Sequence, residues 1–206
     1  MMYRRKGQIE DAVTVSIQQM EVARRVNTPW VLTYAHQGLA ISYEQSGRPA
    51  EAREHYDLML AHARNIPSKW LESEALLGLS KLNDKTVDLQ TREEQIRMAL
   101  SLCRSIGGPV FIGRALFSLG EFMKLQHQPD EALKMFNESA DVWSRHGIKI
   151  GLWWTLKARS DLHRTQGHLD AAQVDAKHSH VLAEEIGLPL YLGESAKSLA
   201  AVAAAR

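Results

Sequence analysis

The chain repeats itself every 40 residues, and this period constrains its fold more strongly than any other feature of the sequence. Alanines stand at equivalent steps of four similar segments: Ala12, Ala52, Ala132 and Ala172. One further column contains Leu39, Leu79, Leu119, Arg159 and Leu199, and its neighbour contains Ala40, Ser80, Gly120, Ser160 and Ala200. A period in this range is typical of proteins in which one supersecondary unit is stacked repeatedly.

Within each copy the apolar residues follow the spacing of an α-helix. Phe111, Ala115, Leu119 and Met123, for example, recur at steps of four residues. The sequence has no segment with the alternation typical of a strand, and the predicted connections are two to five residues long. Connections this short make consecutive helices antiparallel neighbours. We therefore predict an all-α fold.

Start and stop signals locate the helices. Thr28-Pro29 and Pro67-Ser68 are typical of helix N-termini. Gly107, Gly147 and Gly187 stand where the end of a helix favours a left-handed residue. Together these signals predict helices over residues 7–26, 28–46, 49–65, 68–84, 89–106, 108–127, 129–146, 148–166, 169–186 and 188–205.

The recurring small residues indicate where paired helices approach closely. Gly120 and Ala132 are expected to let two backbones come together, with Leu116, Leu119 and Phe136 filling the space opposite. One such helix pair cannot bury its own apolar face, so each pair must stack on the next.

The segment "LFSLGEFMKLQHQPDEALKMF" has the spacing of a known repeat. It resembles the tetratricopeptide repeat (TPR) through Leu116, Leu119, Gly120, Met123, Ala132 and Phe136. The period of 40 exceeds the family's usual 34. This longer form is similar to the sensor domains of maltose-regulator-type bacterial transcription activators. The resemblance implies a right-handed superhelical α-solenoid of about five antiparallel helix pairs, spanning residues 1–206 as a single array.

The third copy departs most from this pattern. It has Arg92 where the other copies have the key alanine. Thr91 and Glu94 nevertheless predict a capping box at the start of its second helix.

The phase of the repeat is also informative. The chain opens with the second helix of a pair and closes with a first helix, residues 188–205, that is rich in alanine. Repeat arrays usually end in a polar capping helix. We therefore expect either a fragment of a longer array or an array whose ends are covered by another copy.

Composition and charge argue against several classes of function. The net charge is +1, so no overall field attracts the chain to nucleic acid or to anionic lipid. No apolar run is long enough to span a bilayer, and no secretory signal is recognisable. A single cysteine, Cys103, cannot form an internal disulfide, which favours a reducing, cytoplasmic setting.

No pattern in the sequence indicates chemistry. There is no HExxH, CxxC or phosphate-binding glycine loop, and no set of nucleophile and base. His178 and His180 are two residues apart and point to different faces of a helix, while Cys103 lies in an inward column and is expected to be a small buried residue. We predict no catalytic residues, no metal site and no cofactor.

The TPR resemblance implies a binding surface, because the first helix of each pair lines the concave face in that family. The equivalent positions here are Tyr34, Gln37, Ile41 and Glu44; Glu74, Leu77 and Lys81; Arg114, Phe117, Glu121 and Lys124; and Trp154, Lys157, Asp161 and Arg164. The last two groups combine cations with aromatic residues, which suits an acidic peptide, a C-terminal carboxylate or an anionic small molecule.

Two alternatives stay open for this surface. Phe117 and Trp154 could pack between helices, and Glu121 and Asp161 could neutralise the cations locally. Since adjacent helical residues cannot both face one core, either Trp153 or Trp154 is expected near the surface.

These features favour a non-catalytic protein–protein interaction scaffold that binds a partner segment, with self-association through the array ends as a further expectation. The alternative is a regulatory domain of a larger bacterial signalling or transcription protein, in which a small molecule in the groove shifts a conformational equilibrium.

Overall fold

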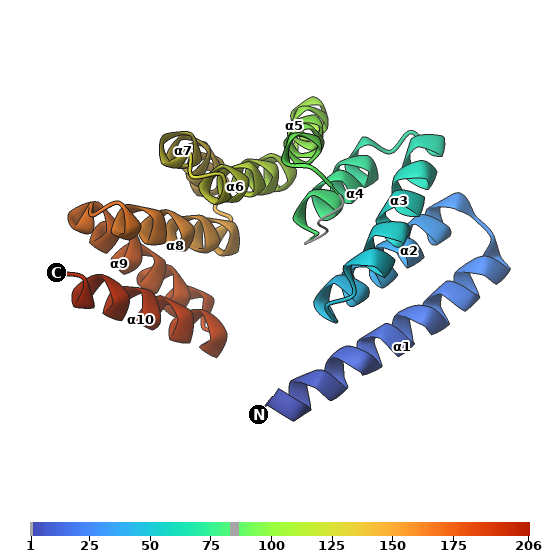
Figure 1. The fold of residues 1–206 in the computed structure, drawn as a ribbon, viewed down its shortest axis with the longest axis horizontal. Coiled ribbons are helices and arrows are strands. Elements are labelled where there is room, and N and C mark those ends of the chain that lie inside the picture. The colour runs from blue at the N-terminus through green and yellow to red at the C-terminus, as the bar shows by residue number, and fades with distance from the viewer. Residues whose placement is uncertain (1, 83–86) are drawn as a thin grey trace. The chain divides into compact units, whose positions relative to one another are not determined.

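The computed structural model describes residues 2–82 and 87–206, and their side chains from Glu10 onward. These residues form ten α-helices and no strand, which confirms the all-α prediction (Figure 1). The helices are α1 (Met2–Val26), α2 (Pro29–Gln45), α3 (Pro49–Asn65), α4 (Lys69–Lys81), α5 (Leu89–Ile106), α6 (Pro109–Leu125), α7 (Pro129–Arg145), α8 (Lys149–Thr165), α9 (Leu169–Ile186) and α10 (Pro189–Ala204). No described helix combines the length and the apolar character needed to cross a membrane.

The helices divide into two compact units, with α1 to α5 in the first unit and α6 to α10 in the second. Within each unit, consecutive helices pack on one another, and the most extensive packing is within the pairs α2–α3, α4–α5, α6–α7 and α8–α9. These four pairs are the repeat copies that the 40-residue register predicts. In each pair the helix that comes first along the chain is the A helix below, and its partner is the B helix.

The predicted helix bounds are close to the observed ones, with two differences. Helix α1 begins at Met2 rather than at residue 7. Helix α4 ends at Lys81, and the end predicted for it at residue 84 lies outside the described residues.

Of the helix starts predicted at Thr28-Pro29 and Pro67-Ser68, only the second has a capping side chain. Ser68 caps α4 as expected, since its hydroxyl accepts a hydrogen bond from the Leu71 N–H. The Thr28 side chain, however, makes no cap hydrogen bond. Pro29 already fixes the backbone at the first helical position, so α2 begins without a capping side chain.

The predicted capping box of Thr91 and Glu94 is wrong, although the predicted start of the helix is right: α5 begins at Leu89, so Thr91 already lies in its first turn. Asp88 occupies the cap position and accepts hydrogen bonds from the Thr91 N–H at 2.7 Å and the Thr91 hydroxyl at 2.9 Å. These bonds stabilise the charged carboxylate and lower the pKa of Asp88. A capping carboxylate also interacts favourably with the helix dipole.

The predicted helix ends are confirmed. Gly107, Gly147 and Gly187 have φ of 77°, 65° and 72°, in the left-handed region that glycine enters without steric cost.

Contacts between glycine and aromatic residues hold the second unit together. A Cβ atom on Gly120 of α6 would lie 2.6 Å from the ring of the fully buried Phe136 of α7, which confirms the predicted close approach. The Trp143 ring of α7 packs between Gly113 of α6 and Gly151 of α8, where added Cβ atoms would lie 2.6 Å and 2.4 Å away. One aromatic side chain therefore joins a pair to the next pair along the chain.

The first unit uses the same kind of contact. Gly78 of α4 lies against the ring of Tyr56 of α3, where an added Cβ atom would be 2.2 Å from a ring carbon. Cys103 of α5 is fully buried, as predicted, and burial raises the pKa of its thiol.

A buried ion pair replaces an apolar contact between α8 and α9. The guanidinium of Arg159 donates to both carboxylate oxygens of Asp175, at 2.6 Å and 2.7 Å, and to the side-chain oxygen of Asn137. The Asp175 side chain is only 6% exposed. At the equivalent positions, the α6–α7 pair has Leu119 and Met135.

A cluster of histidines lies between α2 and α3. The Nδ1 atoms of His36 and His55 are 2.9 Å apart, and the His36 ring stacks on that of His62 with centroids 5.5 Å apart. Burial lowers the pKa of His36 to about 4, and the nearby His55, His62 and Arg24 act in the same direction. His36 is therefore neutral at pH 7 in the folded chain.

Gly113→Ala should destabilise the fold, whereas Gly193→Ala should not. Gly113 of α6 and Gly193 of α10 occupy the same position of the 40-residue register, but Gly113 contacts Trp143 while Gly193 has no atom within 4 Å of an added Cβ. Overpacking costs about 1–3 kcal/mol, and the better helix propensity of alanine returns up to about 1 kcal/mol. Urea unfolding should show a net loss for Gly113→Ala and a small gain for Gly193→Ala; equal effects would contradict the packing described.

Asp175→Ala should lower the free energy of unfolding by about 3 kcal/mol, because it leaves the Arg159 guanidinium without its carboxylate. The double variant Arg159→Leu with Asp175→Met reproduces the residues of the α6–α7 pair. It should unfold within about 1 kcal/mol of the wild type, or be more stable. Chemical denaturation tests both, and a double variant as weak as the single one would refute this role of the ion pair.

The His36 cluster should make the fold sensitive to acid. Unfolded histidine takes up a proton near pH 6.5, whereas folded His36 does so only near pH 4. The unfolded state therefore binds more protons between these values, so this contribution to stability is complete above about pH 6.5 and is lost as the pH falls towards 4. His36→Gln should flatten the decline in unfolding free energy over this range, and His178→Gln, at an exposed site, should not. An unchanged pH profile for His36→Gln would contradict this prediction.

Candidate functional site

The clearest candidate for a binding surface lies in the second unit, where α6, α8 and α10 lie next to one another. An open depression of about 130 Å³ is lined by Phe117, Glu121, Lys124, Trp154, Lys157, Ala158 and Asp161. All of these except Ala158 belong to the binding surface predicted from the sequence. We call the surface formed by these residues together with Arg164 of α8 and Tyr191, Glu194 and Lys197 of α10 the A-helix surface.

Trp154 is the most prominent side chain of this surface. It is 46% exposed, whereas its neighbour Trp153 is 1% exposed, so the prediction that one of the two lies near the surface is confirmed. The rings of Trp153 and Trp154 are arranged edge to face, with centroids 4.8 Å apart. The centroid of the Tyr191 ring of α10 lies 6.4 Å from that of Trp154. Trp154 is thus supported from beneath and from one side while its outer face contacts solvent.

Phe117 is less available than Trp154. It is half-buried and lies against the ring of Phe136 with centroids 5.8 Å apart. Part of the ring therefore packs between helices, and the remainder lines the depression.

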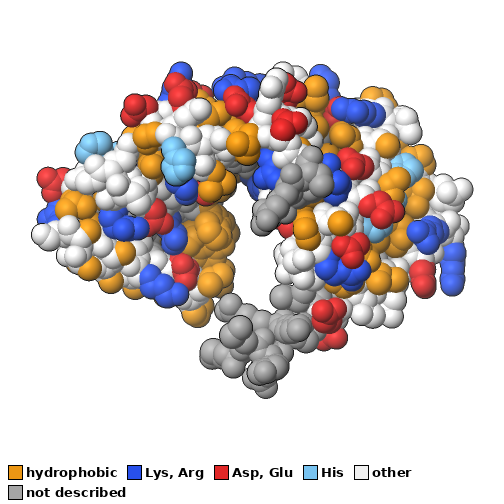
Figure 2. Space-filling model, viewed as in Figure 1, with side chains coloured by type: hydrophobic (Ala, Val, Ile, Leu, Met, Phe, Trp, Pro, Cys, Tyr) orange, Lys and Arg blue, Asp and Glu red, His pale blue; other side chains and the backbone are white. Residues whose placement is uncertain are grey.

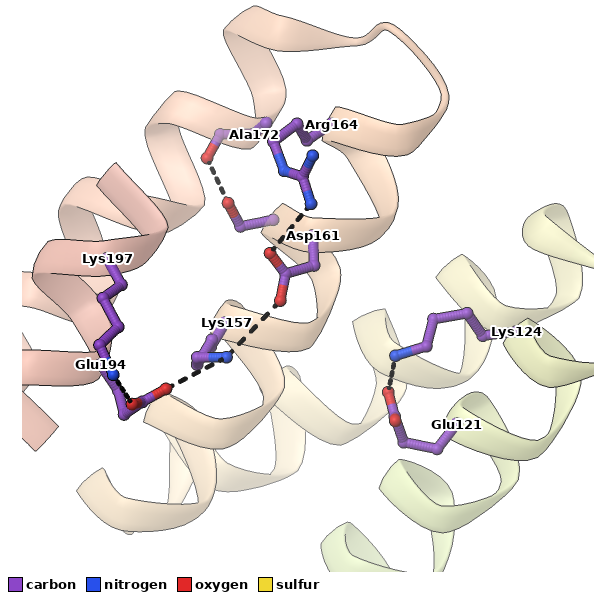
Figure 3. A network of polar contacts seen from close by, with 9 residues as sticks. Glu121, Lys124, Lys157, Asp161, Arg164, Ala172, Glu194 and Lys197 are labelled. Atoms are coloured by element: carbon purple, nitrogen blue, oxygen red, sulfur yellow. Dashed lines mark hydrogen bonds and ion pairs between the residues drawn. The ribbon is translucent and has the colours of Figure 1, made fainter. Parts of the chain in front are cut away.

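Charged side chains alternate in sign along the A-helix surface (Figure 3). On α6, Lys124 forms an ion pair with Glu121. On α8, the Lys157 ammonium lies 3.6 Å from Asp161 and 3.9 Å from Glu194 of α10. The second Asp161 oxygen is 3.8 Å from Arg164.

These ion pairs place negative charges beside the cations of the predicted groove. Each of Lys124, Lys157 and Arg164 has a carboxylate within 4 Å. The field at the surface is therefore a mosaic of both signs. On the visible face of each unit, basic and acidic side chains are likewise interspersed (Figure 2). Arg114, the fourth predicted cation, is half-buried on α6.

The contribution of α10 was not predicted from the sequence. Glu194 bridges towards Lys157 and pairs with Lys197 at 2.7 Å. The register contained the signal, because Glu194 stands 40 residues after Trp154, at the same position of the next A-type helix.

In the first unit, the predicted residues fall in separate places. Tyr34 is exposed and stacks on Trp30 with ring centroids 6.4 Å apart, and the ring of Trp70 lies 5.9 Å from that of Tyr34. These two tryptophans were not predicted as part of the binding surface. Gln37 and Glu74 are half-buried, and neither lines the depression beside Trp154.

Lys81 lies apart from this aromatic group. With Glu44, Gly47, Pro49 and Leu82 it lines an open depression of about 260 Å³. Loss of water around the Lys81 ammonium lowers its pKa, and Glu44 acts in the opposite direction.

In the part of the chain that the structure describes, no group of three or more histidine, cysteine, aspartate or glutamate side chains is arranged to hold a metal ion. His180 instead hydrogen-bonds to the Ser195 hydroxyl at 3.1 Å, which joins α9 to α10.

The chain is similar to known proteins in its structure but not in its sequence. No protein-family model and no curated protein match the chain by sequence. BtubC (BKLC) from P. vanneervenii has a similar structure, with a TM-score of 0.79 at 18% identity over 96% of this chain and 84% of BtubC. A Rap protein in complex with Competence and Sporulation Factor gives 0.84 at 13% identity over 94% of this chain.

TPR-like repeats are also among the similar structures. The nearly identical TPR-like repeats of a kinesin light chain from Podosopora anserina give a TM-score of 0.66 at 13% identity, over 90% of this chain and 92% of theirs. The present chain spans 54% of the Rap protein. At these identities the likeness establishes the fold, and the chain is an array of helix pairs of the TPR-like type.

Proposed function

We propose that this chain is a non-catalytic interaction scaffold, and that the A-helix surface binds an extended segment of a partner protein. The observation that carries the proposal is Trp154, a large aromatic side chain held 46% exposed beside an open depression. Exposed and rigidly supported aromatic residues dominate the binding energy of many protein interfaces. A partner's apolar side chain that enters the depression would cover Trp154 and the accessible part of Phe117.

The ion pairs of the A-helix surface can be exchanged for ion pairs with a partner. The paired side chains are between 23% and 38% exposed, and pairs with this exposure contribute little free energy, typically about 0–1 kcal/mol. An acidic group of a partner can therefore compete with Asp161 or Glu194 for Lys157 at small cost. We infer that the bound segment carries an apolar residue next to an acidic one.

The size of the depression favours a segment over a small molecule. Small-molecule sites usually enclose about 300–1,000 Å³, whereas this depression is open and occupies about 130 Å³. That volume suits one side chain of a longer ligand. The alternative of a small-molecule sensor, including the closer likeness to maltose-regulator-type domains, has less support from this surface.

Trp154→Ala should weaken binding of a partner segment at least about tenfold, which corresponds to about 1.4 kcal/mol. The probe is a displayed library of random linear peptides, selected on the intact chain and then measured by fluorescence anisotropy. Selected peptides should be enriched in an aromatic or aliphatic residue next to Asp or Glu. Lys157→Glu should weaken the acidic peptides specifically, because it reverses the charge that attracts them.

Lys177→Glu is the matched control, since Lys177 is exposed on α9 and lies outside the A-helix surface. It should leave affinity unchanged, and circular dichroism should show equal helix content for all three variants. Peptides that bind wild type and Trp154→Ala equally well would reject the site.

A further inference from the structure

Three charged residues follow Trp154 along the outward face of α8. Lys157, Asp161 and Arg164 are spaced by four and three residues, so they lie on one side of the helix and alternate in sign (Figure 3). Their side chains are 23%, 38% and 32% exposed. Helix α8 contacts both α6 and α10, so this row is exposed although the helix has neighbours from the preceding and the following repeat.

The three side chains keep their hydrogen-bonding capacity. The Asp161 carboxylate lies 3.6 Å from the Lys157 ammonium and 3.8 Å from the Arg164 guanidinium, and both distances are too long for a hydrogen bond. The Arg164 Nε is buried without a partner. Among the described residues, none of the three side chains forms a hydrogen bond, so their donors and acceptors are available to a ligand.

The remaining charges of the A-helix surface are joined by direct hydrogen bonds. The Lys124 ammonium donates to Glu121 on α6, and the Lys197 ammonium donates to Glu194 on α10 at 2.7 Å. A partner's charge would have to break one of these bonds to replace it. On α8 no such bond is lost, so the row on α8 is where charged groups of a partner are bound at the smallest cost.

We propose that the segment bound at the A-helix surface carries an acidic, a basic and a second acidic residue, in this order, opposite Lys157, Asp161 and Arg164. The proposal rests on the proposed function and specifies the ligand of that same surface. A segment with acidic residues alone would bring a negative charge against Asp161, and like charges at an interface exclude a partner. Asp161 thereby selects segments of mixed charge.

Helix geometry sets the spacing of these residues in the ligand. Lys157, Asp161 and Arg164 lie about 4.5, 10.5 and 15 Å along α8 from Trp154, at a rise of about 1.5 Å per residue. In an extended segment, the residues one, three and five positions after the apolar residue lie about 3.3, 10 and 16.5 Å from it. The predicted order is therefore apolar, acidic, any, basic, any, acidic. The row fixes no chain direction, so the pattern holds from either end of the segment.

The proposal is tested by selecting displayed random linear peptides on the intact wild-type chain and on Asp161→Lys. The wild-type chain should select Lys or Arg two positions beyond the acidic residue that adjoins the apolar one, and Asp or Glu two positions further. Asp161→Lys should select Asp or Glu in place of the basic residue, because the charge opposite that position is reversed.

A peptide selected on the wild-type chain then gives the size of the effect by fluorescence anisotropy. Replacing its basic residue by Glu should weaken binding to the wild-type chain about fivefold, since a partly exposed ion pair contributes up to about that factor. The same replacement should strengthen binding to Asp161→Lys by a similar factor.

Asp141→Lys is the matched control, because Asp141 is exposed on α7 and lies outside the A-helix surface. It should select the same pattern as the wild-type chain. Circular dichroism should show equal helix content for both variants and the wild type.

Two outcomes would overturn the proposal and leave the proposed function intact. The first is a set of peptides that require Trp154 but show no preference for a basic residue at the stated position. The second is the same selected pattern on the wild-type chain and on Asp161→Lys. Failure of the proposed function gives a different result, in which the selected peptides bind Trp154→Ala as tightly as the wild type; the proposal then fails with it.

Discussion

The fold depends on the contact between a small residue on one helix and a large side chain on its neighbour. Where Gly120 meets Phe136, or Gly113 and Gly151 meet Trp143, the absence of a Cβ lets two helices approach until the aromatic ring fills the space between them. Because a helix pair has apolar residues on more than one side, this contact must recur from pair to pair. Trp143 shows how this is done, since a single ring contacts helices of two successive pairs.

The same geometry accepts quite different chemistry at individual steps. The α6–α7 pair has the apolar residues Leu119 and Met135 at two facing positions. At the equivalent positions the α8–α9 pair has Arg159 and Asp175, which are joined by two hydrogen bonds. The α2–α3 pair has His55 at the position of Met135, in a cluster with His36. What the register requires is a filled and internally satisfied space between helices, and both a hydrocarbon and a paired charge can meet that requirement. They differ in how they respond to pH and to the loss of one partner.

The outward positions of the A helices are free of this requirement and vary from copy to copy. The position of Trp154 is occupied by Tyr34, Glu74, Arg114 and Glu194 in the other copies. Because of this variation, each repeat copy presents a different outward side chain on the same helical framework. In the second unit, an exposed tryptophan lies next to a row of ion pairs. A surface of this kind can select a ligand through the order of its apolar and charged groups.

The sequence by itself determined the helical class, the repeat register, most helix bounds and the inward residues, including Cys103, Phe136 and Gly120. These properties follow from local spacing and from residue size, which a single copy already displays and the repeat multiplies. Only the tertiary structure decided which of Trp153 and Trp154 is exposed, and that Glu194 of α10 reaches Lys157 of α8. The physical reason is that such contacts join side chains from different helices, and their distances depend on how the helices pack rather than on spacing along one of them.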